Sequence, residues 1–291
     1  MQEKTKTVLL LHLAVFLAGW TGIFGRLISL SGLPLVWYRI LISIPVMAAA
    51  MALTGKLHKS SRKAILMSAG CGFLLAFHWV AFYQSIQTSN VSIGVACVAT
   101  SCFFTTLFDP LINRHRISVK DVLISAITIS GILLIFSLDV RYRVGIAWGL
   151  LCSAIYSVFA ILNINVAEST GEDTPSILFY ELIGGAIILS LCMPFYASAH
   201  PGAIIPDSKD LLGLLILGSV LTIIPFRLQI HALRRLSAFT VNVTYNLEPI
   251  YSIVFAAILF GETREVGISF WCGITLVVIS VILQTYRIQH R

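Results

Sequence analysis

Long apolar stretches, separated by short polar gaps, recur along the chain from Val8 to Tyr286. Most are about 20 residues long, and at roughly 1.5 Å rise per residue such a helix crosses the ~30 Å hydrocarbon core of a bilayer. The pattern predicts ten transmembrane helices and leaves no room for a large soluble domain. Their expected ranges are 8–28, 34–53, 64–87, 91–112, 119–138, 145–166, 175–196, 211–233, 237–260 and 266–286.

The composition supports the same fold class, an all-α integral membrane protein. Of the 291 residues, 57% are hydrophobic and 11% are charged, whereas a soluble domain carries about 25% charged residues. The net charge of +7 comes from basic residues at the ends of the apolar stretches. Anionic lipid head groups explain that placement better than nucleic acid does. We therefore expect the lipid bilayer as a partner, and no nucleic acid.

The distribution of Lys and Arg predicts the orientation. With the N-terminus inside, thirteen of these residues fall in inner loops and tails and five in outer loops. Positive loops stay on the cytoplasmic side, so we expect a multi-pass protein of the cell (inner) membrane with both termini cytoplasmic. The first stretch follows Lys4 and Lys6 as in a signal peptide, but it lacks a convincing small-residue cleavage site and is expected to be an uncleaved span.

No motif in the sequence has the spacing of an enzyme or cofactor site. The six cysteines are scattered singly, without a CxxC pair, which argues against a disulfide framework or a zinc site. HExxH, GxSxG and P-loop motifs are absent. We expect a protein that is not an enzyme and that needs no cofactor and no metal. The alternative is a membrane-embedded enzyme or sensor acting on lipid, for which Asp109 and His115 are the candidate residues.

The chain divides into two weakly similar halves, 1–138 and 139–291, with five expected spans each. Residues 82–86 parallel residues 229–233, at an offset of 147, and residues 37–41 parallel residues 179–183. Because five is an odd number, the second half must be inverted relative to the first. Two inverted five-helix repeats that form one membrane domain around a central site are a transporter design, in which the halves rock to give alternating access.

Several short motifs resemble those of a known family. They are Gly19-Trp20-Thr21, Arg39, Leu247-Glu248-Pro249-Ile250 and Gly261-Glu262. With them the chain resembles, over nearly its whole length, the drug/metabolite transporter superfamily and specifically its ten-span EamA-like exporters. The resemblance implies a cavity lined by spans 1, 3, 4, 6, 8 and 9. The first half departs from the pattern, because Cys102 stands where the family often has proline and Arg114-His115 where it often has Gly-Glu.

Glu248 is the most informative single residue, because it lies about 11 residues inside an apolar stretch and hence near the bilayer midplane. Carboxylates are rare at that depth, and each one indicates a functional site. Asn242, Tyr245, Asn246 and Pro249 share one helical face beside it. Two carboxamides do not suit lipid, so this face is expected to point into the bundle or a wet cavity.

Other residues complete the predicted site. His78 and Trp79 belong to an aromatic patch that suits a planar or cationic ligand, or that packs between helices. Arg227 is deep enough to form an ion pair with Glu248, whereas Arg39 either snorkels outward or lines the outer vestibule. Hydroxyl-rich stripes on spans 4 and 6 are expected to serve packing. The predicted substrate contacts are Trp20, His78, Trp79, Tyr156, Tyr245 and Asn246, with Glu248 and Arg227 as coupling or charge-organising residues.

These features predict a secondary, non-ATP transporter that exports a small organic metabolite, such as an amino acid, by alternating access. Aromatic and carboxamide groups suit an amphiphilic organic solute better than a bare metal ion, which prefers clustered oxygen or thiolate ligands. The expected partners are the small-molecule substrate and a coupled ion, for which a proton is the candidate.

Overall fold

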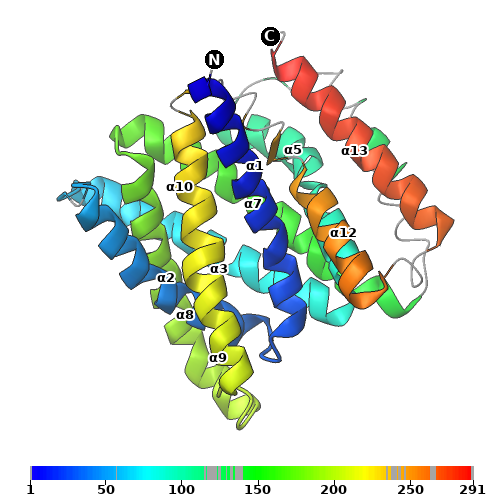
Figure 1. The fold of residues 1–291 in the computed structure, drawn as a ribbon, viewed down its shortest axis with the longest axis horizontal. Helices are drawn as coiled ribbons and strands as arrows, with labels where there is room; N and C mark the ends of the chain where they lie inside the picture. Colours follow the sequence, from blue (N-terminus) through cyan, green and yellow to red (C-terminus); the bar gives the residue numbers. More distant parts are fainter. Residues whose placement is uncertain are drawn as a thin grey trace.

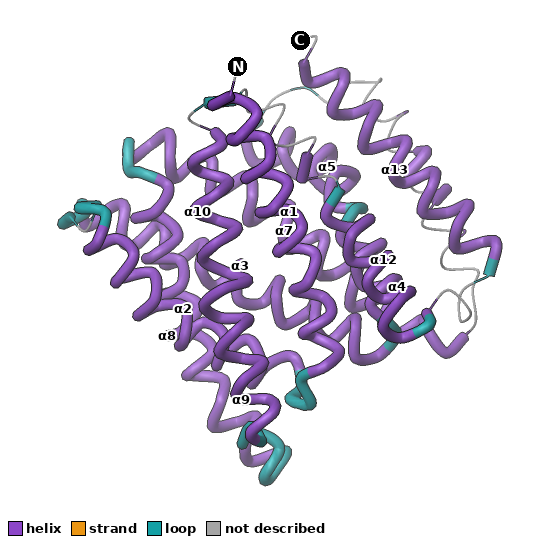
Figure 2. The backbone as a smooth tube through the Cα atoms, viewed as in Figure 1, coloured by secondary structure: helices purple, strands orange, loops and turns teal. Residues whose placement is uncertain are grey.

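The protein is described by a computed structural model in which nearly every segment is a helix (Figure 1; Figure 2). The structure describes residues 2–56, 58–114, 116, 123, 126–128, 130–131, 134, 140–233, 235–236, 241, 244–245, 247–262 and 267–289. Within these ranges no strand occurs. The helix that begins the chain and the helix that ends it have their terminal ends on the same side of the bundle (Figure 1).

The helices follow the apolar stretches closely. They are α1 (Gln2–Leu27), α2 (Gly32–Leu53), α3 (Arg62–Thr88), α4 (Val91–Val98), α5 (Ser101–Asn113), the short 3-10 helix η1 (Val140–Tyr142), α7 (Arg143–Thr170), α8 (Thr174–Ala199), α9 (Ser208–Leu215), the π-helical turn η2 (Ile216–Val220), α10 (Leu221–Leu233), α12 (Glu248–Phe260) and α13 (Ile268–Gln289). The expected first to third, sixth and seventh spans correspond to single helices.

Seven segments of the described chain are long and apolar enough to cross a membrane: Thr5–Leu27, Gly32–Leu53, Arg62–Thr88, Val91–Asn113, Arg143–Thr170, Thr174–Ala199 and Ser208–Ala232. The expected ninth span is represented by a shorter apolar helix, Glu248–Phe260, and the expected tenth by α13, whose described apolar part is Trp271–Ser280. The expected fifth span, 119–138, lies largely outside the described residues. The all-helical membrane architecture is therefore confirmed, with seven full-length spans described.

Local signals in the sequence determine where the helices begin and end. Four helices start after a residue whose side chain accepts a hydrogen bond from the backbone N–H three positions on, which satisfies one of the free donors of the first turn. These N-cap residues are Ser61, Asn90, Asp173 and Asp207. Helix α12 ends at Phe260, and the next residue, Gly261, has a positive φ of 69°, which favours glycine.

The two halves of the chain pack tightly against each other. Helix α3 packs against α7 and α8, while α1 packs against α10 and α12. The approach of α3 to α8 depends on glycine, because a Cβ added at Gly72 would lie 2.0 Å from the carbonyl oxygen of Glu181 and one at Gly184 would lie 2.1 Å from that of Ala69. Without a side chain at these positions, the two backbones come into direct contact.

The expected fourth span is broken, although no proline or glycine stands at the break. Helix α4 ends at Val98 and α5 starts at Ser101. Hydroxyl groups from α7 satisfy the backbone near the break, since Ser153 donates to the Cys97 carbonyl (2.6 Å) and Ser157 to the Ser101 carbonyl (2.7 Å). The hydroxyl-rich stripes thus have the structural role predicted for them, and they permit an interruption that the sequence pattern did not predict.

Two buried carboxylates link the halves. Glu262, just after α12, accepts hydrogen bonds from the backbone N–H groups of Val91 (3.0 Å) and Ser92 (2.8 Å) and from the Ser92 hydroxyl (2.7 Å). It therefore caps the N-terminus of α4. Asp210 on α9 accepts two further bonds from Ser29, one from its backbone N–H (2.8 Å) and one from its hydroxyl (2.5 Å).

Candidate functional site

A cavity of about 980 Å³ lies between the helices. Elements from all six spans expected to line it contribute residues: α1, α3, α4, α7, α10 and α12. Helices α2, α8 and α13 contribute as well. The volume is in the range of small-molecule sites, and most of the lining side chains are apolar, as is typical of such sites. The break between α4 and α5 also borders the cavity, through Val98, Ala99 and Ser101.

Five of the eight predicted site residues line this cavity, and the structure brings them together from four segments of the chain. They are His78 and Trp79 on α3, Tyr156 on α7, Tyr245 before α12, and Glu248 at the start of α12. The phenol of Tyr245 donates a hydrogen bond to the Pro225 carbonyl on α10 (3.3 Å).

The other three predicted residues do not lie in the described wall of this cavity. Trp20 packs between aromatic rings, with its ring centroid 4.8 Å from that of Phe255, while its neighbour Thr21 lines the cavity instead. Asn246, like Asn242 on the same expected face, lies outside the described residues. Arg227 lines a second, smaller cavity of about 320 Å³ that also borders Lys56.

The hypothesised ion pair between Arg227 and Glu248 is not formed in the described structure. On α10, Thr222 and Phe226 are four residues apart and share the face that lines the main cavity. Arg227 is one residue further on and is rotated by about 100° from Phe226. Depth in the membrane can be read from sequence position, but this rotation depends on how α10 packs.

Arg39 was not among the predicted site residues. The sequence left two alternatives for it: extending outward to the membrane surface, or lining the outer vestibule. It lies on α2, is 5% exposed and lines the main cavity. Its Nε donates to the hydroxyl of Thr222 (3.0 Å) and its Nη1 to the hydroxyl of Tyr83 (2.8 Å). The guanidinium carbon lies 3.9 Å from the centroid of the Trp79 ring, which is close contact for a cation over an aromatic face.

Glu248 lies on the same cavity as Arg39, and the two charges interact electrostatically. They do not form a direct ion pair within the described residues, and no described group donates a hydrogen bond to the Glu248 carboxylate. The side chain is partly exposed, toward the cavity that it lines. A cation and a carboxylate therefore line one space without neutralising each other by contact.

His78 is held between α3 and α7. Its Nδ1 lies 3.3 Å from the carbonyl oxygen of Cys152 and 3.1 Å from the sulfur of the same residue. It therefore either donates to the carbonyl or accepts from the thiol, depending on the tautomer. The imidazole ring lies 4.9 Å from the ring of Tyr156. His78 and Tyr156 therefore form an aromatic pair on the cavity wall.

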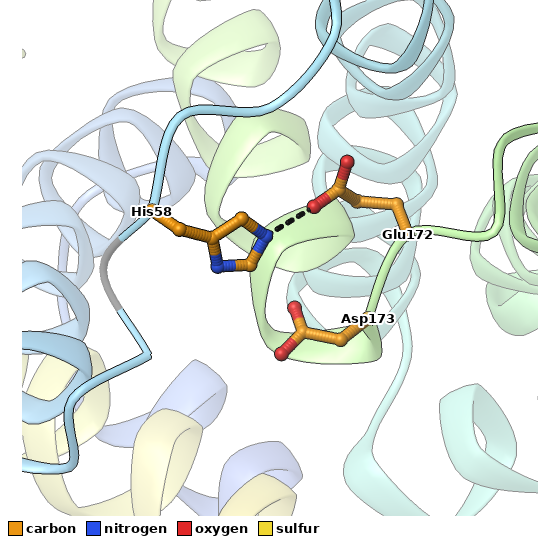
Figure 3. Close-up of side chains that lie close together, drawn as sticks. All are labelled: His58, Glu172 and Asp173. Atoms are coloured by element: carbon orange, nitrogen blue, oxygen red, sulfur yellow. Dashed lines mark hydrogen bonds and ion pairs between the residues drawn. The ribbon is translucent and has the colours of Figure 1, made fainter.

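A second cluster of ionisable groups lies away from the cavity, where the connection from α2 to α3 meets that from α7 to α8 (Figure 3). His58, Glu172 and Asp173 each place a potential ligand atom within 4.8 Å of the others. Interactions within the protein already account for the closeness of these three side chains, because Nε2 of His58 lies 2.6 Å from Glu172 and Asp173 caps α8. The hydrogen bond to Glu172 raises the pKa of His58, and a second contact, with the Lys56 carbonyl, raises it further.

Of the two residues considered for lipid chemistry, Asp109 lies in the described part of the chain. Asp109 accepts a hydrogen bond from Asn113 one turn further along α5 (2.6 Å). His115 lies outside the described residues. Asn113 in turn accepts from Asn165 on α7 (2.9 Å), so Asp109 belongs to a polar network between helices.

Known proteins resemble this chain over nearly its full length. A Bacillus subtilis (strain 168) protein described as an uncharacterized transporter, YxxF, is 25% identical over 269 residues, which cover 89% of this chain and 84% of its own. A protein of known crystal structure matches with a TM-score of 0.61 over 96% of this chain and 98% of its own. Its sequence identity is 14%, so this match shows a shared fold.

The EamA-like transporter family matches the sequence twice, over residues 5–137 and 143–286. Together the two matched segments cover nearly the whole chain. They confirm the family resemblance drawn from the short motifs. The chain belongs to the EamA-like transporter family, within the drug/metabolite transporter superfamily, and its function is transport across a membrane.

Proposed function

We propose that this protein is a secondary transporter that exports small organic metabolites, such as amino acids, from the cell across the inner membrane. The cavity of about 980 Å³ is the observation that carries the proposal. Both halves of the chain supply its wall, and it holds a cation and a carboxylate among mainly apolar side chains. Such a mixture suits an amphiphilic solute with polar and apolar parts.

The proposed mechanism is alternating access between two inverted five-span repeats, with both termini in the cytoplasm. Two observations support it. The family matches once in each half. Furthermore, α3 of the first half packs against α7 and α8, while α10 of the second half packs against α1 and α2. The equivalent helices thus exchange partners between halves, as a two-fold relation between repeats requires.

Glu248 is proposed as the coupling residue, with a proton as the coupled ion. A carboxylate deep in a membrane is costly, and protonation removes its charge. Because no described group donates a hydrogen bond to Glu248, the carboxylate is free to exchange a solute contact for a proton. His78, Trp79, Tyr156 and Tyr245 are proposed to contact the solute, and Asn246 is proposed to join them from the same segment.

Counterflow in proteoliposomes tests this function. Vesicles that contain the purified protein are loaded with an unlabelled extract of cytoplasmic metabolites, and entry of each isotope-labelled metabolite is followed by mass spectrometry. We expect saturable entry of a subset of metabolites that Glu248→Gln abolishes. The matched control is Glu168→Gln, because Glu168 is exposed near the end of α7. If no metabolite enters faster than in protein-free vesicles, the proposal is refuted.

A further inference from the structure

We propose that Arg39 binds an acidic group of the transported solute, and that this group is a monoanionic carboxylate. The inference rests on the transport function proposed above and adds the residue that selects the substrate class. It follows from how the guanidinium is held, which of its donors lack partners, and which charges line the cavity.

Arg39 is held rigidly by three neighbours on two other helices. Tyr83 and Trp79 come from α3, and Thr222 comes from α10. Two hydrogen bonds, of 2.8 and 3.0 Å, hold the Nη1 and Nε groups of the guanidinium, while the Trp79 ring covers a face at 3.9 Å. A planar cation held at two of its nitrogens and on one face keeps its third nitrogen, Nη2, in a constant position, which is the preorganisation that specific binding requires.

Part of the Arg39 guanidinium has no partner among the described residues. Arginine has five N–H donors, and the protein uses two of those on Arg39. Nη2 makes no hydrogen bond with a described group, and it is not among the described side-chain atoms that are both fully buried and without a partner. Its N–H groups therefore reach accessible space, which for this residue is the cavity that it lines. Donors left unpaired in an apolar wall are a binding site for an acceptor.

The charge on Arg39 also lacks a contacting anion among the described residues. Among the described lining residues Glu248 is the carboxylate, and it stays beyond ion-pair distance. A buried arginine with no contacting anion is unfavourable, and a solute carboxylate placed against it removes that cost. The planar N–H pairs of a guanidinium match the two oxygens of a carboxylate, so that the contact is bidentate.

The rest of the wall favours a carboxylate over a phosphate ester. A phosphate monoester carries a charge of about −1.5 to −2 at neutral pH and needs several cationic groups, whereas the described wall has one guanidinium. Glu248 on the same cavity repels a dianion more strongly than a monoanion. The apolar side chains that make up most of the wall accommodate the remainder of a monocarboxylic solute.

Substrate pairs that differ only at the acidic group test the inference. The probes are the protein amino acids, their carboxamides and the C3–C6 straight-chain monocarboxylates, each measured for counterflow in vesicles containing wild-type protein, Arg39→Lys or the control Arg143→Lys. Arg143 is exposed at the start of α7. Arg39→Lys keeps a positive charge but loses the planar donor pair, so we expect it to raise the KM of carboxylates about 30-fold.

The carboxamide probes distinguish a role of Arg39 in binding the solute from a purely structural role. We expect carboxamides to enter wild-type vesicles poorly and at a rate that Arg39→Lys leaves unchanged, whereas a merely structural role of Arg39 would impair both series equally. Thermal unfolding shows whether Arg39→Lys is folded. Thr222→Val provides a second variant, because it removes one bond to Nε and keeps the guanidinium. It should raise the KM of carboxylates by a smaller factor without changing entry of the amides.

The outcomes are distinct. Equal transport of acids and amides by the wild-type protein overturns the assignment of Arg39. Transport of other metabolites from the extract, with no transport of any carboxylate probe, also overturns it but leaves the transport function standing. Absence of entry in both experiments refutes the proposed transport of small organic metabolites itself.

Discussion

The bonds from Glu262 to the first turn of α4 give the most direct stability prediction. The first N–H groups of a helix have no partner within the helix, and here two of them donate to one carboxylate that is fully buried. Asn90 already satisfies the N–H of Ile93, so it cannot replace Glu262. The negative charge also interacts favourably with the positive end of the helix dipole.

Replacing Glu262 by alanine removes all three bonds at once. It leaves the backbone donors of Val91 and Ser92 unpaired in a buried place, and each unpaired buried donor costs about 1–3 kcal/mol. We expect a total loss of about 3 kcal/mol for the two, which is a large fraction of the roughly 5–15 kcal/mol by which folded proteins are stable. At roughly 2–4 °C per kcal/mol, the melting temperature should fall by about 6–12 °C.

Thermal unfolding of purified protein in detergent, followed by tryptophan fluorescence, measures this loss. Ser92→Ala removes only the hydroxyl bond and should lower the melting temperature by a smaller amount. Glu168→Ala changes an exposed glutamate and should have almost no effect. A melting temperature of Glu262→Ala within about 2 °C of the wild type, or equal effects of the two glutamate substitutions, would refute the reasoning.

Two further predictions concern packing and pH. Gly72→Ala places a Cβ 2.0 Å from the carbonyl oxygen of Glu181, so α3 and α8 must separate. We expect the free energy of unfolding to fall by at least about 2 kcal/mol, measured by thermal unfolding. The control is Gly70→Ala, which should not destabilise the protein because nothing lies within 4 Å of the added Cβ. The pKa of His58 is raised by Glu172. The stability that this pair adds is therefore full below the unfolded pKa of about 6.5 and lost as pH rises through the higher folded value. The difference in melting temperature between wild type and His58→Gln should decrease accordingly, and a difference that grows with pH would contradict this assignment.

Helix positions were largely predictable, because length, apolarity and capping all act locally. The expected range 64–87 became Arg62–Thr88, and 175–196 became Thr174–Ala199. In both cases the structure shows a capping residue, Ser61 or Asp173, immediately before the apolar stretch. The break at Ala99 and Thr100 was not predictable in this way. It depends on hydroxyl groups of α7, more than 50 residues away, that satisfy the backbone near the interruption.

The part of the candidate site that depends on local sequence was also predictable. Aromatic residues such as His78 and Trp79 share one helix, so their proximity follows from helical spacing. The surroundings of Arg39 do not, because its hydrogen-bond partners Tyr83 and Thr222 lie 44 and 183 residues away. Sequence position gave the depth of Arg39 but not its neighbours. Those neighbours determine that it is fixed in a cavity wall and does not extend to the membrane surface.

Three glutamates of the described chain, Glu181, Glu248 and Glu262, show how hydrogen-bond partners determine the role of a carboxylate. Glu262 accepts three hydrogen bonds and Glu181 accepts one from Asn163, whereas Glu248 receives none from the described residues. A carboxylate with protein donors stabilises the fold, and one without them weakens it unless a ligand or proton binds. Glu248→Gln breaks no protein hydrogen bond, so its melting temperature should equal or exceed that of the wild type while metabolite flux is lost. If Glu248→Gln instead unfolds the protein as Glu262→Ala is expected to do, Glu248 is a structural residue, and the cavity must be assigned its function without it.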